Sequence, residues 1–251
     1  MTVFYFTATG NSLAVAKAIG GTLRSIPQVI GEAKRYQDDA IGVVFPVYNW
    51  GLPRMVRQFL QSAQFDAPYT FAVGTYGFAC GKCMENIQSV ASRPFDYTAS
   101  IRMADNFIPG FDQRKEAAGF GKRHVAENLA RIVAEINACA RILDRVHPLQ
   151  RLAHPLVAAS EAKNIDSNTA KRFRIDEKCT LCGICAKVCP AGNLTVTDRV
   201  RPASRCEGCL ACVHLCPQNA VHVPREKNEA RWRNPDVTLG EIIAANQRNS
   251  Q

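Results

Sequence analysis

The chain has 251 residues, of which 47% are hydrophobic and 21% are charged, a composition typical of a globular protein with a sizeable core. It contains no apolar run approaching the ~18 residues that a membrane-spanning helix needs, and no basic leader followed by an apolar stretch. These features exclude the membrane classes, and we expect a cytoplasmic protein with no membrane partner.

The first predicted strand, residues 3–6, is a short aromatic and β-branched run that leads directly into a hydroxyl-rich loop. A helix is expected next, because Val15, Ile19 and Leu23 recur at i, i+4 and i+8. Loop amides and the positive end of the helix dipole then point at one spot, which makes an anion site. The loop is neither a Gly-x-Gly-x-x-Gly turn nor a Walker loop, which would need a lysine. The candidate anion-binding residues are Thr7, Thr9, Gly10, Asn11 and Ser12.

Further strands are predicted over residues 41–45, 71–74 and 98–103, with helices after the first two of these. Strands that alternate with helices indicate a parallel sheet with right-handed crossovers, whose ligands bind beyond the carboxyl ends of the strands. A long helix is expected over residues 122–145, with Leu143 on its apolar stripe and Cys139 among its core residues.

The loops after residues 45 and 74 contain aromatic side chains suited to a planar cofactor. Tyr48, Trp50 and Tyr76 can stack on a ring, and backbone amides can meet its polar edge. The alternative is that these are half-buried loop aromatics without a ligand. The candidate residues are Pro46, Tyr48, Asn49, Trp50 and Gly51 in the second loop, and Thr75, Tyr76 and Gly77 in the third.

The first loop reads Thr-x-Thr-Gly-x-Ser and resembles the phosphate loop of flavodoxins, with serine in place of the commoner final threonine. The resemblance implies an α/β fold, a flavodoxin-like doubly wound parallel sheet over residues 1–147, that binds flavin mononucleotide (FMN). The phosphate would be held without a cationic side chain, and the ring would lie between the second and third loops. Relative to short flavodoxins, residues 105–121 are an addition, expected to fold over the flavin edge or to meet the C-terminal part.

Cys80 and Cys83 form an isolated Cys-x-x-Cys pair in the third loop. A redox dithiol beside the flavin and half of a zinc site are both conceivable. The sequence context of thioredoxin chemistry is missing, however, and no second pair is left to complete a zinc site. We therefore expect two reduced loop residues.

Eight of the eleven cysteines form two copies of the pattern C-x-x-C-x-x-C-x-x-x-C-P. Four thiolates at this spacing can bind a cubane of iron and sulfide. A disulfide framework would need an oxidising compartment, and structural zinc prefers two separated Cys-x-x-Cys pairs. The pattern resembles the bacterial two-cluster ferredoxins over residues 172–224, which implies a small α+β domain with two [4Fe-4S] clusters.

In that arrangement the last cysteine of each run reaches the other cluster. The implied ligands are Cys179, Cys182, Cys185 and Cys216 for cluster I, and Cys206, Cys209, Cys212 and Cys189 for cluster II. Each oxidised cluster with its four thiolates carries about −2, so two clusters offset about four of the nine formal positive charges. We therefore expect no nucleic-acid partner. His214, between two ligands, is expected to face solvent.

Two segments flank the cysteine-rich part. Residues 148–171 are expected to form a linker that packs through Leu149, Leu152, Leu156 and Val157. Residues 225–251 form a tail with a short helix, because Thr238 and Glu241 have capping-box spacing, and this helix is expected to brace the two domains.

The order of the domains resembles the flavodoxin–ferredoxin fusion proteins grouped as EFR-type ferredoxins, to about residue 224. That resemblance implies an electron carrier that passes single electrons between FMN and two [4Fe-4S] clusters to a protein redox partner. The alternatives are an FMN-dependent reductase of a small quinone-like molecule, fed by the clusters or by a nicotinamide, and a scaffold with structural clusters. No catalytic residue is predicted, because the sequence contains no recognisable triad or carboxylate pair.

The composition of the cysteine-rich part predicts raised redox potentials of the clusters, because its many cations favour the reduced, more negative state of each cluster. These cations are Lys171, Arg172, Arg174, Lys187, Arg199, Arg201 and Arg205. We expect midpoint potentials above those of a two-cluster ferredoxin with an acidic surface. Redox titration of both proteins in the same buffer measures this, and potentials no higher than those of the acidic ferredoxin would contradict it.

Overall fold

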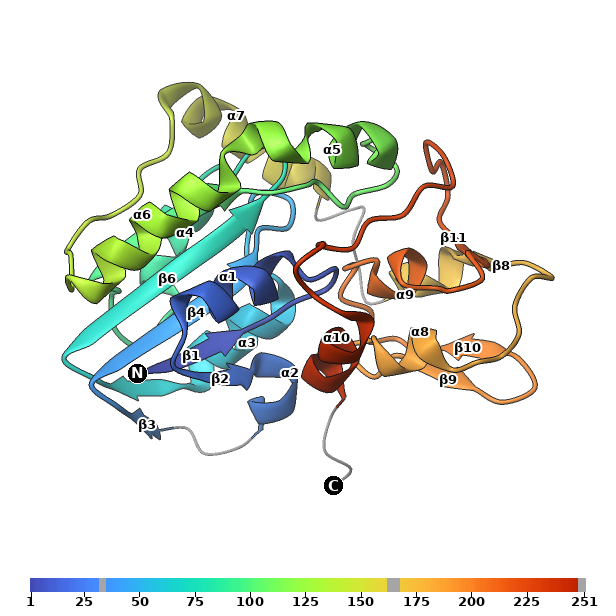
Figure 1. Ribbon diagram of the computed structural model, residues 1–251, viewed down its shortest axis with the longest axis horizontal. Coiled ribbons are helices and arrows are strands. Elements are labelled where there is room, and N and C mark those ends of the chain that lie inside the picture. Colours follow the sequence, from blue (N-terminus) through green and yellow to red (C-terminus); the bar gives the residue numbers. More distant parts are fainter. Residues whose placement is uncertain (32–34, 162–167, 248–251) are drawn as a thin grey trace.

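The structure is a computed structural model that describes residues 1–31, 35–161 and 168–247, without the side chains of residues 158–161. At its centre is a parallel five-stranded sheet with the order β2-β1-β4-β6-β7 (Figure 1). This is the 2-1-3-4-5 order of the flavodoxin-like doubly wound fold, and it confirms the predicted fold class. The strands are β1 (Thr2–Tyr5), β2 (Thr22–Ser25), β4 (Ala40–Pro46), β6 (Tyr69–Tyr76) and β7 (Tyr97–Arg102).

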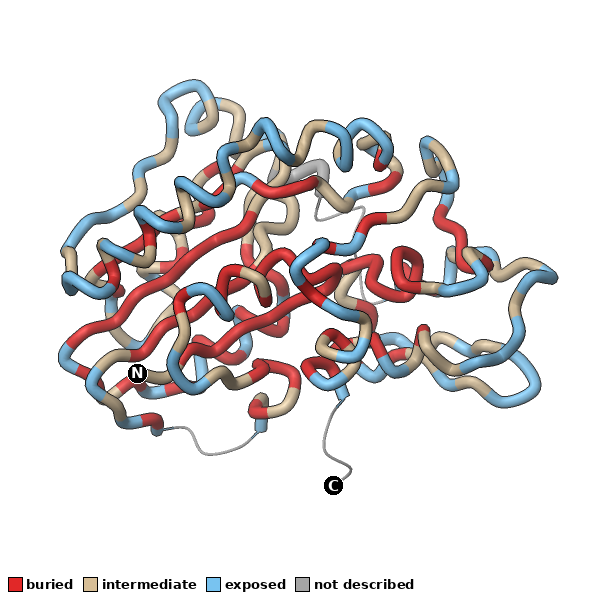
Figure 2. Tube along the Cα trace, viewed as in Figure 1, coloured by how far each residue is buried: buried red, intermediate tan, exposed pale blue. Residues whose placement is uncertain are grey.

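Successive residues of each strand point to opposite faces of the sheet and pack into two separate apolar cores, one on each face. Val3, Val44 and Val73 pack beneath α1 (Asn11–Ile19) and α6 (Val125–Asn137). Phe4, Val43 and Ala72 face the other side. That side is covered by α2 (Ile26–Val29), α3 (Arg54–Ser62), α4 (Cys83–Asn86) and the short 3-10 helix η1 (Ile87–Ser89). Burial on both faces explains the nearly continuous apolar runs of β4 and β6, and Figure 2 shows these strands as buried along most of their length.

Two predicted elements are wrong in extent. Leu23 lies in β2 and not on the first helix, because α1 ends at Gly20 and the positive φ of Gly20 and Gly21 turns the chain back beside β1. The long helix of residues 122–145 is broken. Within that range only α6 (Val125–Asn137) is an α-helix; it is preceded by the 3-10 helix η2 (Phe120–Arg123) and by a separate helix, α5 (Gln113–Gly119).

Beyond α6, the chain pairs with the edge of the sheet. The amide of Thr98 donates to the Ile142 carbonyl (2.9 Å), and the amide of Asp144 donates to the Thr98 carbonyl (3.1 Å). This extended pairing ends the helix early. It leaves Cys139 exposed at a positive φ and Leu143 half exposed, so neither is a helix core residue.

The cysteine-rich part contains two antiparallel pairs of strands and two short helices, consistent with a ferredoxin-like domain (Figure 1). One pair is the hairpin of β9 (Leu194–Val196) and β10 (Val200–Pro202). The other pairs β8 (Arg174–Ile175) with β11 (Val221–His222), the first and last strands of this part. The helices are α8 (Ile184–Lys187) and α9 (Ala211–His214), and the 3-10 helix η3 (Thr169–Arg172) precedes β8. A small parallel pair, β3 (Arg35–Gln37) and β5 (Gln64–Asp66), extends the first domain.

The linker folds as a helix, α7 (Pro148–Glu161), but its leucines do not pack. Leu149, Leu152 and Leu156 are 70–78% exposed, which contradicts the expectation that the linker packs through them, whereas Val157 is half-buried. The polar face docks instead: Gln150 and His154 accept hydrogen bonds from the amides of Gly81 and Lys82. Residues 162–167 of the linker lie outside the described residues.

The tail helix is confirmed as α10 (Leu239–Asn246), with the predicted capping box between Thr238 and Glu241. Asn246 at its end donates to the Thr7 carbonyl in one domain and to the Val188 carbonyl in the other. The helix therefore braces both domains, as expected; residues 248–251 lie outside the described residues. None of the helices in the described ranges combines the length and apolar character that crossing a membrane requires.

Substitution of Gly42 in β4 tests how closely this strand packs against Phe71 of β6. A Cβ at this position would lie 2.1 Å from the ring of Phe71, its partner on β6. We predict that Gly42→Ala lowers the free energy of unfolding by about 1–3 kcal/mol, because the buried ring has no room to move. Gly119→Ala is the matched control, since nothing lies within 4 Å of its would-be Cβ. Denaturant unfolding measures both, and equal stability of the two variants would contradict the packing.

Candidate functional site

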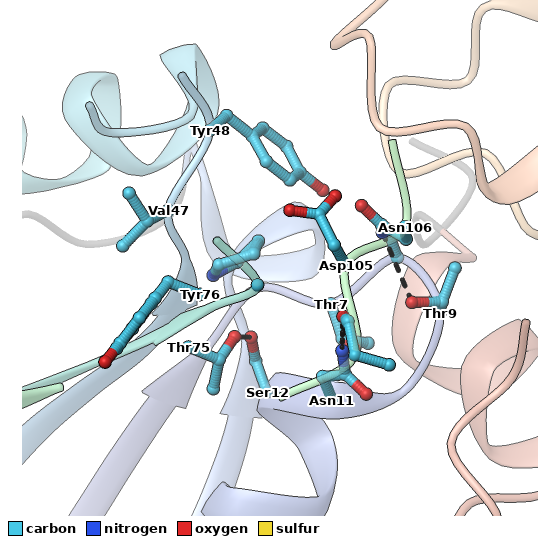
Figure 3. A pocket seen from close by; sticks show the side chains of 14 residues that line it. Thr7, Thr9, Asn11, Ser12, Val47, Tyr48, Thr75, Tyr76, Asp105 and Asn106 are labelled. Carbon is cyan, nitrogen blue, oxygen red and sulfur yellow. Dashed lines mark hydrogen bonds between the residues drawn. The ribbon is translucent and has the colours of Figure 1, made fainter. Parts of the chain in front are cut away.

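The first loop connects β1 to α1 and surrounds a small cavity of about 40 Å³ at the carboxyl ends of the strands (Figure 3). Gly10 begins the helix with φ +100°. A Cβ there would lie 3.0 Å from the Cβ atoms of Asn234 and Val237. Glycine is therefore required both by the positive φ and by the close approach of these two residues. The predicted residues that line the cavity are Thr7, Thr9, Asn11, Ser12, Pro46, Tyr48, Thr75, Tyr76 and Gly77.

Apart from the carboxyl group of Asp105, the polar side chains of this cavity carry no charge, and some of them are unpaired. Ser12 and Thr75 share a hydrogen bond between their hydroxyls (2.8 Å), and Asn106 donates to Thr9 Oγ1 (3.3 Å). Thr7 Oγ1 is buried without a hydrogen-bond partner. An unpaired buried hydroxyl costs about 1–3 kcal/mol, which a bound anion would recover. No lysine or arginine is found among the described residues that line the cavity, so the donor set fits a phosphate bound by amides and hydroxyls.

A second cavity of about 320 Å³ adjoins the first, and Tyr48, Gly77 and Asp105 are among the residues that line both. Its walls are largely apolar and include the aromatic rings of Trp50, Phe78, Phe107 and Phe111. Gly208 and Leu210, which flank Cys209, close the side toward the cysteine-rich domain. The volume and the apolar lining are those of a small-molecule site.

The second loop is held in shape by a tight turn. Tyr48 and Gly51 exchange backbone hydrogen bonds of 2.8 and 3.0 Å, and Asn49 and Trp50 between them both have positive φ. Trp50 stacks on His154 of α7, with the ring centroids 6.1 Å apart. Asn49 and Trp50 line only the larger cavity, and Gly51 lines neither because its role is to close the turn.

Tyr48 lies between the cavity that the three loops line and the second cysteine run. Its hydroxyl is buried without a hydrogen-bond partner. Burial raises the pKa of Tyr48 well above its ordinary value, and the nearby charges of Cys209, Glu207 and Cys206 raise it further. One side chain therefore contacts the cavity and lies beside two predicted ligands of cluster II.

Asp105 belongs to the site but was not predicted. It lines both cavities and accepts hydrogen bonds from the amides of Phe78 (3.2 Å) and Phe107 (2.9 Å), and burial raises its pKa. Gly77 makes room for it, since a Cβ on Gly77 would lie 2.3 Å from Asp105 Cβ. The only signal in the sequence was the position of Asp105 at the start of the added segment.

The added segment meets the cysteine-rich part, as expected, and it also lines the larger cavity. Asn106 and Phe107 line the larger cavity, while Ile108 is fully buried against Cys185, Leu210 and other residues of the cysteine-rich domain. The segment is therefore part of both the wall of the larger cavity and the interface between the domains.

His214 is not exposed, contrary to expectation. Its Nε2 lies 2.7 Å from the Asn106 carbonyl oxygen, and its Nδ1 accepts a hydrogen bond from the Trp232 amide (2.9 Å). Burial lowers the pKa of His214 to about 4, so the ring is neutral at pH 7. The residues that cover it come from the added segment and the tail, which are far from it in sequence.

The eight cysteines gather in two groups. Cys179, Cys182, Cys185 and Cys216 line one cavity. Cys212 has Cys209, Cys189 and Cys206 among its electrostatic neighbours, and burial raises its pKa well above the ordinary value. These groups coincide with the ligand sets implied by the ferredoxin resemblance.

The backbone of both cysteine runs suits anionic sulfur. Leu181 and Gly208 occupy the same place in the two runs and have φ of 56° and 67°, and Gly183 and Leu210 have 77° and 58°. Left-handed residues in such loops turn successive amides toward one side and make an anion-binding concavity. Amides accordingly donate to sulfur at Cys189 (from Asn193, 3.2 Å), Cys206 (from Gly208, 3.3 Å) and Cys216 (from Ala220, 3.3 Å).

The thiols are too widely spaced for a single ion. All eight are free, and in the part of the chain that the structure describes no three His, Cys, Asp or Glu side chains are close enough to hold one metal ion. In a cubane each thiolate binds a different iron, so wider spacing is required. The donor set therefore fits two clusters better than zinc.

Comparison with known proteins identifies the cysteine-rich part. Residues 178–220 match the family model of the 4Fe-4S dicluster domain, so the chain contains an iron–sulfur domain. A search of curated proteins finds no significant match.

Solved structures with similarity to the chain include two candidate flavoproteins, from Bacteroides uniformis and Bacteroides eggerthii. Both are 16% identical with a TM-score of 0.32, covering 46% and 49% of this chain and 94% and 97% of their own. The Trp repressor binding protein from Bacillus subtilis is 10% identical with a TM-score of 0.28, covering 47% of this chain and 94% of its own. At these values the fold assignment rests on the strand order of the sheet itself.

Cys80 and Cys83 are buried free thiols. Cys80 lies in the third loop, as expected, whereas Cys83 is the first residue of α4. Burial raises the pKa of Cys80 to about 12 and that of Cys83 well above its ordinary value. A thiol is protonated below its pKa, so at pH 8 only about one Cys80 in ten thousand is the reactive thiolate.

We predict that iodoacetamide at pH 8 labels the exposed Cys139 and leaves Cys80 and Cys83 unlabelled in folded protein with its clusters intact. The rate at Cys80 should rise about tenfold per pH unit up to pH 10, still below its pKa. Peptide mapping by mass spectrometry measures both rates. Fast labelling of Cys80 at pH 8 would show an activated thiol and contradict this assignment.

Proposed function

We propose that this protein carries electrons between an FMN held by its flavodoxin-like domain (residues 1–147) and two [4Fe-4S] clusters held by its ferredoxin-like domain (residues 172–224). The proposal rests chiefly on the larger cavity, which has Tyr48 of a cofactor loop on one wall and Leu210 beside Cys209 on the other. A cofactor in that cavity lies next to cluster II. This combination corresponds to the flavodoxin–ferredoxin fusion proteins of the EFR type.

The phosphate-bearing form of the flavin is favoured by the small cavity. Thr7 Oγ1 and the first-turn amides of α1 would hold the phosphate, and Tyr48, Trp50 and Tyr76 would flank the ring. When bound, a flavin supplies the ability to take up two electrons and release them one at a time. The chain itself positions the ring, excludes water from one side and provides the neighbouring clusters.

The two cluster sites differ in exposure, which suggests their order. Cys206, Cys209 and Cys212 are buried, whereas Cys182 is exposed. Figure 1 shows the loop between β8 and α8, which contains Cys179 and Cys182, at the end of the molecule farthest from the sheet. Cluster II is then the relay beside the flavin, and cluster I is the port to a partner.

The partner is a redox protein with an acidic docking face. Both proteins act in the cytoplasm. Lys178, Lys187 and Arg199 are exposed in the region of the cysteine runs, and among the described residues none of them has an ion pair within 4.0 Å. Unpaired surface cations steer an acidic partner and make association sensitive to salt.

The reductase alternative is disfavoured by the added segment. Asp105, Asn106, Phe107 and Phe111 occupy one wall of the larger cavity, where a small substrate would have to approach the ring. The described residues form no second nucleotide-binding sheet that could hold a nicotinamide. A holo-protein that oxidised a nicotinamide with a quinone and without a protein partner would reverse this preference.

Cofactor content tests the proposal directly. Anaerobically purified protein should contain about one FMN and about eight iron and eight sulfide ions per chain, measured by visible spectroscopy and chemical analysis. Protein that holds its iron but binds no flavin, even after incubation with free FMN, would contradict the proposal.

Thr7→Val tests the phosphate site with a variant of the same shape. Removing the unpaired hydroxyl should weaken FMN binding about tenfold, the loss of roughly one hydrogen bond to a charged group. Riboflavin lacks the phosphate, so its affinity should not change. Fluorescence titration measures both ligands, and Thr22→Val on the exposed edge strand is the control. Equal losses for both ligands would place the phosphate elsewhere.

A further inference from the structure

The tail passes directly over the phosphate loop. In Figure 1 the segment that leads into α10 runs beside the start of α1. The amide of Asn234 donates to the Thr9 carbonyl (2.8 Å), and its side chain donates to Asn11 Oδ1 (3.2 Å). Trp232 Nε1 donates to the same Asn11 oxygen (3.2 Å). Asn234 and Trp232 are both buried, so these bonds are not exchanged with water.

These contacts determine what Asn11 can do. Its side-chain oxygen accepts from Trp232 and Asn234, and its side-chain nitrogen donates to the Ala104 carbonyl (3.0 Å). Both lone pairs of the oxygen are therefore used within the protein. Asn11 holds the first turn of α1 between Ala104, which precedes the added segment, and the tail, and this fixes the direction of the loop amides.

The other residues of the loop are held from the same side. Asn246 donates to the Thr7 carbonyl, and Asn106 donates to Thr9 Oγ1. The Asn106 carbonyl in turn contacts Nε2 of His214, and Nδ1 of the same ring accepts a hydrogen bond from the Trp232 amide. The loop conformation therefore depends on residues that follow the second cysteine run by 16 positions or more along the chain.

We propose that Trp232 and Asn234 are positioning residues of the phosphate site, so that the site for a phosphomonoester is completed by the tail and not by the flavodoxin-like domain alone. This inference rests on the proposed function. An anion site made of backbone amides depends on their direction, and a loop released from its supports presents the same groups in a poorer arrangement. The tail acts through Asn11 and the backbone of Thr9, without touching the ligand.

The test uses the full chain with its clusters in place. Trp232→Phe removes the indole donor but keeps the packing against Phe120, whose ring centroid lies 5.0 Å away. Asn234→Ala removes the side-chain donor and keeps the backbone bond to Thr9. Arg233→Ala, an exposed residue of the same segment, is the matched control.

FMN and riboflavin affinities are measured by fluorescence titration, together with iron and sulfide content. We expect each variant to bind FMN about tenfold more weakly, with riboflavin affinity and iron content unchanged and Arg233→Ala like the wild type. Wild-type FMN affinity in both variants would overturn the inference. Equal weakening of FMN and riboflavin would also overturn it, because the tail would then be a general brace. If the wild type itself bound no FMN, the proposed function would fail, a result distinct from either.

Discussion

The packing of the second cysteine run against the carboxyl ends of the parallel strands determines where every other part of the site can lie. Cys209, Ala211 and Leu215 share an apolar core with residues of the sheet. Glu207 is fixed at the start of α3, where the Met55 amide donates to its carboxylate (3.2 Å) and Arg54 pairs with it; Arg54 also donates to the Cys206 carbonyl. Since ligands of such sheets bind at this edge, a cofactor there lies beside the second run.

The cysteine-rich domain depends on its inorganic cores for more than electron transfer. Its own apolar core is small, and burial raises the pKa of Cys185 to about 11. Cluster assembly must therefore displace protons from buried thiols, so binding of iron and folding are coupled. Leu181 and Gly208 have the same left-handed backbone at matching places in the two runs, and the Gly208 amide donates to the sulfur of Cys206.

Local patterns carried most of what the sequence could predict. The strand–loop–helix order indicated the fold class and the cysteine spacing indicated two runs of cluster ligands, because both depend on neighbours in sequence. The exchange of the last cysteine between the two groups was implied only by the resemblance to ferredoxins. Contacts between distant residues could not be predicted. Thr98 pairs with Ile142, so α6 ends earlier than its apolar pattern indicates. The helix α7 docks through Gln150, so its leucines are exposed. Asp105, Trp232 and Asn234 were missed as site residues because their roles arise only when distant segments meet.

The central claim is that the flavin site adjoins cluster II, because the larger cavity is lined both by Tyr48 and by Leu210, the neighbour of Cys209. Crystallography of the anaerobically prepared holo-protein, with anomalous diffraction at the iron edge, tests it most directly by locating both four-iron centres relative to the ring. The account predicts that the nearer centre is bound by Cys206, Cys209, Cys212 and Cys189, with Tyr48 in contact with the ring. A ring bound elsewhere, or nearer to the centre held by Cys179 and Cys182, would contradict it.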